Sequence, residues 1–405
     1  MPFVGFSEME QRVALMRDHE TGAFSVTDLC VRYGIDRTTF YLWAQRRAGG
    51  DAAWFVDRSR APHGCPHRTA AEVADAAIEL RRRFAHFGPK KVRARLLEMG
   101  LDGVPAASTI GDILKRAGLV TPRRRHRRAV SMPVTGERED VVNAEWACDF
   151  KGWFRTRDGR RCDPLTVSDG CSRYLLDVRI VEPTIGGVRP VFERLFGDHG
   201  LPCAIRCDNG PPFGSDGAGG LTRLSAWWLT LGIEPHFIRP GAPQDNGRHE
   251  RMHRELKAHT SRPAAWDFAS QQRRFDEFRH HYNEERPHEA LGQRMPGKLW
   301  KPSTRPMPVF ADTPWYDADH EVRHVRTSGE IKWRQSSVFV SEALIGEPVG
   351  LIERDDGTHL VRFCTRELGI IDHKGRFRRF APPRYKLREA AKTAPDCGGC
   401  SRSNL

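Results

Sequence analysis

Three acidic residues far apart in the chain each stand at the boundary of a strand-like or helix-like segment. Asp149 lies at the end of the run 144–150, Asp208 follows the apolar segment 202–207, and Glu250 lies just inside a segment of helical composition. Side chains at the ends of strands can converge at one edge of a sheet. Carboxylate oxygens are the ligands that Mg²⁺ prefers, and metal ions neutralise charge on a phosphate under attack. The pattern therefore indicates a metal-dependent site for cutting phosphodiester bonds.

Strand-like and helix-like segments alternate from Asn143 to about residue 300. Apolar runs bounded by turn residues predict strands at 145–154, 164–167, 174–181, 203–207 and 234–238. Helical spacing of apolar residues predicts helices at 184–197, 221–231, 250–259 and 269–284. Asp158-Gly159 predicts a hairpin turn between the first two of these strands. The order of these segments alone indicates a mixed α/β domain.

Four segments of this region carry a resemblance to a known family. They are Trp146–Phe150, Asp208–Phe213, Pro240–Arg251 and Tyr282–Leu291. In this order they resemble the catalytic core of bacterial insertion-sequence DDE transposases, which is similar to the core of retroviral integrases. The interval from Asp208 to Glu250 is slightly longer than is usual in that family. An isolated Asp-Asn-Gly is a common turn, so the resemblance depends on all four segments together.

The resemblance implies a ribonuclease-H-like fold for 143–300 and a catalytic triad of Asp149, Asp208 and Glu250. It also implies that the triad binds two Mg²⁺ ions, with Mn²⁺ as an alternative, and that Asp149 bridges them. Such an enzyme nicks a DNA strand and transfers the freed 3′ end to target DNA without an organic cofactor. Taken singly, each acid has an ordinary alternative: a turn or cap for the aspartates, and a helix-surface pair with Arg254 for Glu250.

Residues 1–50 have the pattern of a helix-turn-helix DNA-binding domain. Apolar residues recur at helical spacing, Gly34 can supply the positive φ that ends one helix, and Asp36 can cap the next. The segment 37–47 is then the recognition helix. The side chains expected to contact DNA are Arg37, Thr38, Thr39, Tyr41 and Arg46. A helical hairpin without DNA contact is the alternative.

Residues 69–121 predict a second helix-turn-helix-like domain, separated from the first by a linker at 51–68. One helix is expected to begin at Thr69, and a later one to have Ser108 as its N-cap. Two such domains would grip one long DNA site. The alternative is that the second domain serves only for packing.

The charge of the chain indicates a polyanionic partner. The net charge is +13 and the cations cluster instead of spreading evenly. A basic linker is expected at 122–142. The cations expected to contact DNA are Arg123, Arg124, Arg125, Arg127 and Arg128 in this linker and Arg251, Arg254 and Lys257 after Glu250. A solvated tether and a solvated helix face are the alternatives.

Short alternating apolar runs in 301–385 predict a small β-barrel, with strands near 330–333, 338–340, 348–353, 359–363 and 368–371. The polar tail 386–405 is expected to be disordered. In the family that the chain resembles, such a barrel contacts DNA or a partner subunit.

Other features bear on compartment and metal. The cysteines are dispersed, the N-terminus does not resemble a secretory signal, and no apolar run approaches the ~20 residues of a membrane span. We therefore expect a cytoplasmic, nucleoid-associated bacterial protein without membrane contact. His63, Cys65 and His67 and the pair Cys397 and Cys400 are incomplete donor sets for zinc.

The sequence as a whole predicts a multidomain transposase that binds insertion-sequence ends, cleaves DNA with Mg²⁺ and transfers the strand. Its partners would be the element ends and target DNA. A homo-oligomer is expected because two ends must join one target. One alternative is a DNA-binding regulator derived from a transposase that has lost catalysis, and another is a nuclease of related fold. Asn283, Arg286 and His288 are interpreted as packing residues, and His253 as a substrate-placing or surface residue.

Overall fold

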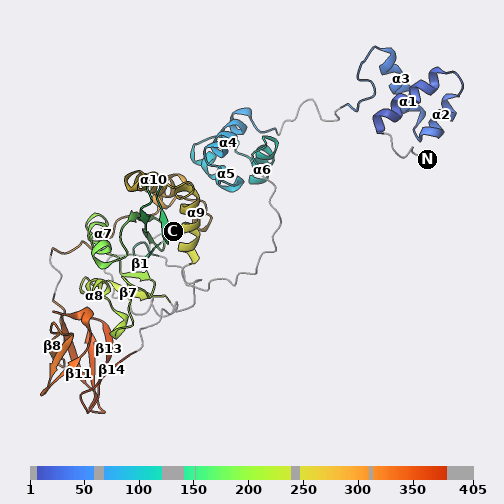
Figure 1. The fold of residues 1–405 in the computed structure, drawn as a ribbon. Helices are drawn as coiled ribbons and strands as arrows, with labels where there is room; N and C mark the ends of the chain where they lie inside the picture. Colours follow the sequence, from blue (N-terminus) through green and yellow to red (C-terminus); the bar gives the residue numbers. More distant parts are fainter. Residues whose placement is uncertain are drawn as a thin grey trace. The chain divides into compact units, whose positions relative to one another are not determined.

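The computed structural model describes residues 7–58, 68–120, 141–150, 152–238, 247–309 and 313–380. The chain divides into two compact units, 1–68 and 69–405. Figure 1 shows their helices and strands. The domain boundaries expected within the second unit stay predictions.

The first unit contains three helices, α1 (Glu8–Glu20), α2 (Val26–Tyr33) and α3 (Arg37–Ala48). They enclose a small core made by Leu15, Met16, Leu29, Cys30, Phe40 and Trp54. Gly34 ends α2 in the left-handed conformation with φ 64°, as expected from the sequence. Asp36 occupies the N-cap position of α3, but its side chain makes no capping hydrogen bond, so that part of the prediction is wrong.

The second unit begins with α4 (Ala71–Arg83), α5 (Pro89–Glu98) and α6 (Ala107–Arg116). Their shared core consists of Val73, Ala77, Leu80, Phe84, Phe87, Val92, Leu96, Ile110 and Leu114. The first of these helices begins two residues later than predicted. Ser108 is not an N-cap: it lies inside the first turn of α6, and Ala106 takes the cap position without a side-chain hydrogen bond.

A five-stranded mixed sheet forms the centre of the second unit, with strands β1 (Glu145–Phe150), β4 (Pro164–Asp169), β5 (Leu175–Ile180), β6 (Ala204–Cys207) and β7 (Glu234–Phe237). The strand order is β5-β4-β1-β6-β7. The first three strands in sequence pair antiparallel, whereas β1, β6 and β7 run parallel. The expected mixed α/β core is therefore confirmed.

The long strand predicted at 145–154 is two elements. It stops at Phe150, and β2 (Phe154–Arg155) then pairs with β3 (Arg161–Cys162) as a separate hairpin. The predicted turn at Asp158-Gly159 connects these two strands and has Gly159 at φ 86°. The turn prediction is thus correct, while the strand boundary is not.

Helices cover both faces of the mixed sheet (Figure 1). The helices α7 (Ile185–His199) and α8 (Arg223–Thr230) share one apolar core with Trp146 and Ile205 of the sheet. On the other face lie α9 (Gly247–Thr260) and α10 (Phe268–His280), which pack on a core that includes Leu175 and Val178. A π-helical turn, His281–Glu285, continues α10.

The C-terminal part forms two antiparallel sheets. The larger contains β8 (Glu321–His324), β11 (Pro348–Glu353), β12 (His359–Phe363), β13 (Arg366–Ile371) and β14 (Phe377–Arg379), in the order β14-β13-β12-β11-β8. The smaller pairs β9 (Glu330–Trp333) with β10 (Ser336–Phe339). Both sheets contribute to one apolar core, which also takes in Leu229 of α8. The predicted strands are present, β8 and β14 were not predicted, and closure into a barrel stays a prediction.

Within the described ranges, no helix has both the length and the apolar character needed to cross a membrane.

Candidate functional site

The ends of β1 and β6 bring Asp149 and Asp208 together. These strands pair in parallel with Glu145 opposite Ala204 and Ala147 opposite Arg206. Continuing this register by two residues sets Asp149, on β1, beside Asp208, the first residue after β6. Neighbouring parallel strands lie about 4.8 Å apart. The first two acids of the predicted triad therefore share one end of the central sheet.

Two buried thiols lie directly behind these acids. Cys148 and Cys207 precede Asp149 and Asp208, and both are about 1% exposed. Burial, and next a hydrogen bond with Cys207, raise the pKa of the Cys148 thiol well above its ordinary value. Both thiols belong to the apolar core beneath α7 and α8. Because side chains alternate along a strand, the acids face the other side of the sheet, where α9 packs.

Asp208 has the properties of a cation ligand. Burial raises the pKa of its carboxyl above the ordinary value, while a hydrogen bond from the backbone of Gly210 lowers it by less. Its Oδ1 atom is buried and has no hydrogen-bond partner in the described part of the chain. A buried carboxylate oxygen without a donor is costly unless something cationic pairs with it. This oxygen therefore fits a bound divalent ion.

Glu250 lies in the first turn of α9, whose two faces differ in character. The buried face consists of His249, Met252, His253, Leu256 and Thr260. The exposed face includes Glu250 together with the three predicted DNA-contacting cations, Arg251, Arg254 and Lys257. The interpretation of His253 as a surface residue is wrong, because this imidazole is 8% exposed, and a role in placing the substrate stays a prediction.

The buried face of α9 is attached to the sheet beside Asp149. The imidazoles of His249 and His253 both hydrogen-bond to the hydroxyl of Thr166 on β4. Thr166 is the antiparallel partner of Asp149 in the β1–β4 ladder. The helix that carries Glu250 is therefore bound to the strand pair that carries Asp149.

The three acids are not a compact cluster. A group of three possible metal ligands within 4.8 Å of one another occurs in the described ranges at Asp317, Asp319 and His320 instead. Two ions about 3.5–4 Å apart, each with ligands at about 2.1 Å, can hold terminal carboxylates that are several ångströms further apart. The predicted arrangement, in which Asp208 and Glu250 bind different ions, therefore does not require such a cluster. The metal-binding role of the triad stays a prediction.

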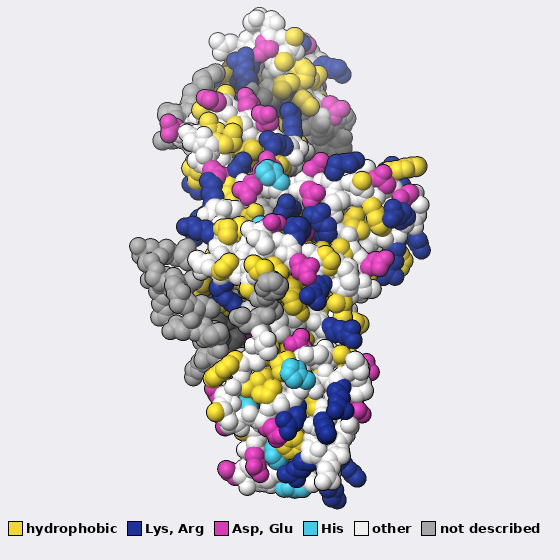
Figure 2. Space-filling view, turned by 90° about the vertical axis from the view of Figure 1, so that its left-hand side faces the viewer, with side chains coloured by type: hydrophobic (Ala, Val, Ile, Leu, Met, Phe, Trp, Pro, Cys, Tyr) yellow, Lys and Arg dark blue, Asp and Glu magenta, His cyan; other side chains and the backbone are white. Residues whose placement is uncertain are grey.

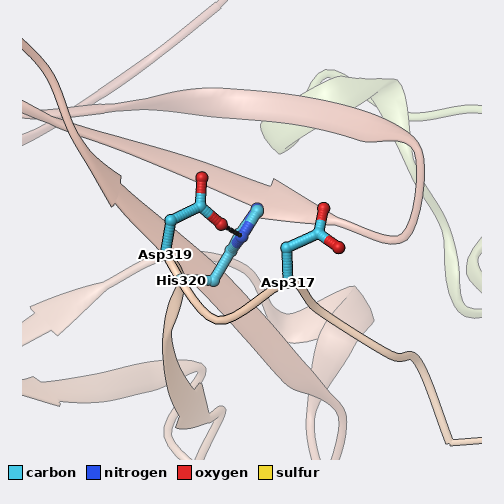
Figure 3. Close-up of side chains that lie close together, drawn as sticks. All are labelled: Asp317, Asp319 and His320. Carbon is cyan, nitrogen blue, oxygen red and sulfur yellow. Dashed lines mark hydrogen bonds and ion pairs between the residues drawn. The ribbon is translucent and has the colours of Figure 1, made fainter.

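The cluster at Asp317, Asp319 and His320 lies just before β8, in the C-terminal part, and was not predicted. Figure 3 shows the three side chains close together, with the His320 Nδ1 atom hydrogen-bonded to Asp319 at 2.7 Å. Both aspartates are exposed. The Asp-x-Asp-His spacing is the one sequence signal that could have found it.

The Tyr282–Leu291 segment makes structural contacts, as interpreted from the sequence. Asn283 hydrogen-bonds to the backbone of Leu175 on β5, and Arg286 pairs with Glu255 of α9 and with His288. Burial, and next the Arg286 guanidinium, lower the pKa of His288 to about 2. This segment therefore fixes α9 and α10 on the sheet.

The predicted DNA contacts on α3 are partly exposed. Arg37, Thr38 and Tyr41 are exposed, while Thr39 and Arg46 are half-buried. The arginine run 123–128 lies outside the described residues, as do His63, Cys65, His67, Cys397 and Cys400. On the face drawn in Figure 2, the coloured Lys and Arg side chains are interspersed with Asp and Glu. DNA contact by these residues stays a prediction.

Known proteins resemble parts of this chain. The integrase core domain family matches residues 231–296, which include α9 and α10. The uncharacterized 39.2 kDa protein of insertion element IS476 from Xanthomonas euvesicatoria is 30% identical over 182 residues, 43% of this chain and 50% of that protein. The uncharacterized 31.7 kDa protein of insertion element IS407 from Burkholderia multivorans is 28% identical over 238 residues, 57% of this chain and 79% of that protein. The chain thus spans about half the length of the first relative. The expected resemblance to insertion-sequence proteins with an integrase-type core is confirmed.

Solved integrase structures are more distant. The catalytic core of BIV integrase is 18% identical, covers 39% of this chain and 93% of its own, and has a TM-score of 0.30. The simian T-cell lymphotropic virus intasome in complex with PP2A regulatory subunit B56 gamma is 16% identical. The match covers 76% of this chain and 100% of that chain, with a TM-score of 0.34. The HTLV-2 integrase core in complex with magnesium (trimeric form) is 14% identical. The match covers 39% of this chain and 97% of that chain, with a TM-score of 0.29.

Proposed function

We propose that this protein is a transposase that binds the ends of an insertion sequence and catalyses Mg²⁺-dependent DNA cleavage and strand transfer. The observation that carries the proposal is the parallel register of β1 and β6, which sets Asp149 beside Asp208. Glu250 would be the third acid of the triad, on a helix that is bound to the same sheet. Similarity to insertion-element proteins and to the integrase core domain family supports the proposal.

Asp149, Asp208 and Glu250 would hold two Mg²⁺ ions, with Mn²⁺ as an alternative. When bound, these ions would neutralise charge on the attacked phosphate and lower the pKa of the attacking water. Asp208 would contribute the buried oxygen that no described donor engages. Glu250 would act from the exposed face of α9, where DNA can approach.

The neighbouring cations would hold the DNA. Arg251, Arg254 and Lys257 share the exposed face of α9 with Glu250. Cations beside a scissile phosphate position the backbone without reading its sequence. Recognition of the element ends would come from α3, with Arg37, Thr38 and Tyr41 among its exposed side chains.

Substituting one acid tests the enzymatic part of the proposal. Asp149→Asn should retain specific binding of an end-bearing duplex and lose Mg²⁺-dependent cleavage of it. Asp216→Asn, an exposed aspartate outside this site, is the matched control and should cleave like the parent. If Asp149→Asn cuts as well as the parent, the role of Asp149 is wrong. A parent protein that binds the ends without cutting them would instead be a DNA-binding regulator.

Two further parts of the proposal concern recognition and assembly. Arg37→Ala should weaken binding to the element end more than binding to unrelated DNA, because a base contact specifies sequence. The protein should form an oligomer on end-bearing DNA, since two ends join one target. An equal loss of affinity for both DNAs would contradict end recognition by Arg37. A single subunit bound to paired ends would contradict the assembly.

A further inference from the structure

One buried hydroxyl lies where β1, β4 and α9 meet. The Oγ1 atom of Thr166 is 3.0 Å from the backbone carbonyl oxygen of Asp149. It is also 2.6 Å from Nε2 of His249 and 2.7 Å from Nε2 of His253. Thr166 is completely buried. A single atom thus contacts both the strand that carries Asp149 and the helix that carries Glu250.

The hydrogen-bonding capacity of this hydroxyl fixes the direction of each bond. A threonine hydroxyl has one proton to donate and can accept two hydrogen bonds. A carbonyl oxygen only accepts, so the Thr166 proton goes to Asp149. Both imidazoles must then donate from Nε2–H. All three positions on the Thr166 oxygen are in use, so the two rings have defined orientations.

Ser168 contacts the second ring nitrogen of His249. Its Oγ lies 3.3 Å from Nδ1 of that ring. Because Nε2 donates to Thr166, the neutral tautomer of this ring accepts at Nδ1, and the Ser168 hydroxyl is then the donor.

A buried ion pair lies beside this network. Arg206 of β6 is 2.9 Å from Glu145 of β1, and His236 of β7 is 2.6 Å from the same carboxylate. The Arg206 guanidinium is also close enough to His249 to interact with that ring electrostatically. The helix α9 is therefore attached to β4 by directional bonds to Thr166 and Ser168 as well as by apolar packing.

We propose that Thr166, His249 and His253 are positioning residues that set the place of Glu250 relative to Asp149. The inference rests on the proposed function. His249 immediately precedes Glu250 and His253 follows it within one helical turn, so anchoring both rings fixes the rotation and height of that turn. The same hydroxyl holds the Asp149 backbone. Misplacing catalytic groups by about 1 Å can cost about 100-fold in rate.

Three variants of matched chemistry test this. Thr166→Val removes the hydroxyl at similar volume, and Thr166→Ser retains it. Thr260→Val makes the same change at a buried site on α9, where the hydroxyl donates to the Leu256 carbonyl of the same helix at 2.7 Å. Each variant is compared by Mg²⁺ binding in calorimetry, single-turnover cleavage and binding of end-bearing DNA.

Thr166→Val should weaken Mg²⁺ binding and slow cleavage by about 10–100-fold, as substitutions behind metal ligands do, with unchanged DNA binding. Thr166→Ser should retain most of the Mg²⁺ affinity and cleavage rate, and Thr260→Val should equal the parent in both. Parent-like Mg²⁺ binding and cleavage in a folded Thr166→Val would overturn the proposal. So would equal impairment in Thr166→Ser.

The ring protons give a readout that needs neither metal nor a folded variant. Imidazole ¹⁵N spectra of the parent should show His249 and His253 protonated at Nε2, and His249 unprotonated at Nδ1. A proton on His249 Nδ1 would overturn the network. A parent that binds no Mg²⁺ and cuts no DNA defeats the proposed function, and the ¹⁵N signals then decide whether the network exists.

Discussion

The side-chain amide of Asn283 binds both backbone groups of Leu175, accepting from its N–H at 2.8 Å and donating to its carbonyl at 3.0 Å. Leu175 opens β5, an edge strand of the central sheet. Unpaired edge groups are costly when buried, and Asn283 is 3% exposed. The amide therefore completes the edge of the sheet.

Asn283→Ala should lower the free energy of unfolding by about 1–3 kcal/mol, because a buried N–H and carbonyl lose their partners. Urea denaturation of the variant and the parent measures this. Gln45→Ala, at an exposed position of α3, is the control. A change within about 0.5 kcal/mol for Asn283→Ala would show that water replaces the amide without cost.

His288 should make the protein sensitive to acid. Its folded pKa of about 2 is lower than the ordinary value of 6.5, so the folded state binds fewer protons than the unfolded state below pH 6.5. Stability is thus retained above pH 6.5 and lost as the pH falls toward 2. At about pH 5.5 the loss from this histidine is about 1.4 kcal/mol.

Denaturation at several pH values measures this loss. His288→Gln should be less stable at neutral pH but show a smaller further loss on acidification. His324→Gln, at an exposed position of β8, is the matched control. Equal acid sensitivity in His288→Gln and the parent would contradict the assignment.

The ion pair between Arg206 and Glu145 should be costly to break from one side. Both residues are about 5% exposed. Arg206→Met leaves the buried Glu145 carboxylate without its guanidinium partner, and the expected loss is about 3–5 kcal/mol in chemical denaturation. The double variant Glu145→Gln/Arg206→Met removes both charges and should be more stable than Arg206→Met. A double variant whose loss of stability equals the sum of the losses in Glu145→Gln and Arg206→Met would argue against direct pairing.

The exposed cations of α9 should contribute to DNA binding through phosphates. Replacing Arg251, Arg254 and Lys257 together by alanine should reduce the slope of log K against log salt by about 0.9 for each DNA phosphate that these side chains neutralise. Binding to specific and unrelated DNA should weaken alike. Arg189→Ala, on the helix α7 that covers the other face of the sheet, is the control. An unchanged salt slope in the triple variant would favour the solvated-face alternative.

Much of the fold follows from local sequence patterns. The strands and helices of the central domain were predictable because apolar runs are bounded by turn residues, as at Asp158-Gly159. Asp149 and Asp208 were recognisable at the ends of such runs. The strands β8 and β14 were missed because Glu321–His324 and Phe377–Arg379 are mostly charged or polar. They form strands by hydrogen-bonding to β11 and β13.

What the sequence did not reveal depends on interactions between distant segments. Thr166 and His249 are far apart in the chain, and no local pattern predicts their hydrogen bond. The burial of His253 did have a signal: it shares a helical stripe with Met252 and Leu256. The caps expected at Asp36 and Ser108 failed because capping depends on the path of the preceding backbone.

The proposed activity requires that Asp149, Asp208 and Glu250 jointly hold divalent ions. Anomalous scattering from crystals of the protein grown with Mn²⁺ would locate those ions. We predict two ions at the shared end of β1 and β6, with Asp149 contacting both. Mn²⁺ bound at Asp317, Asp319 and His320, with none at Asp149, would contradict this prediction.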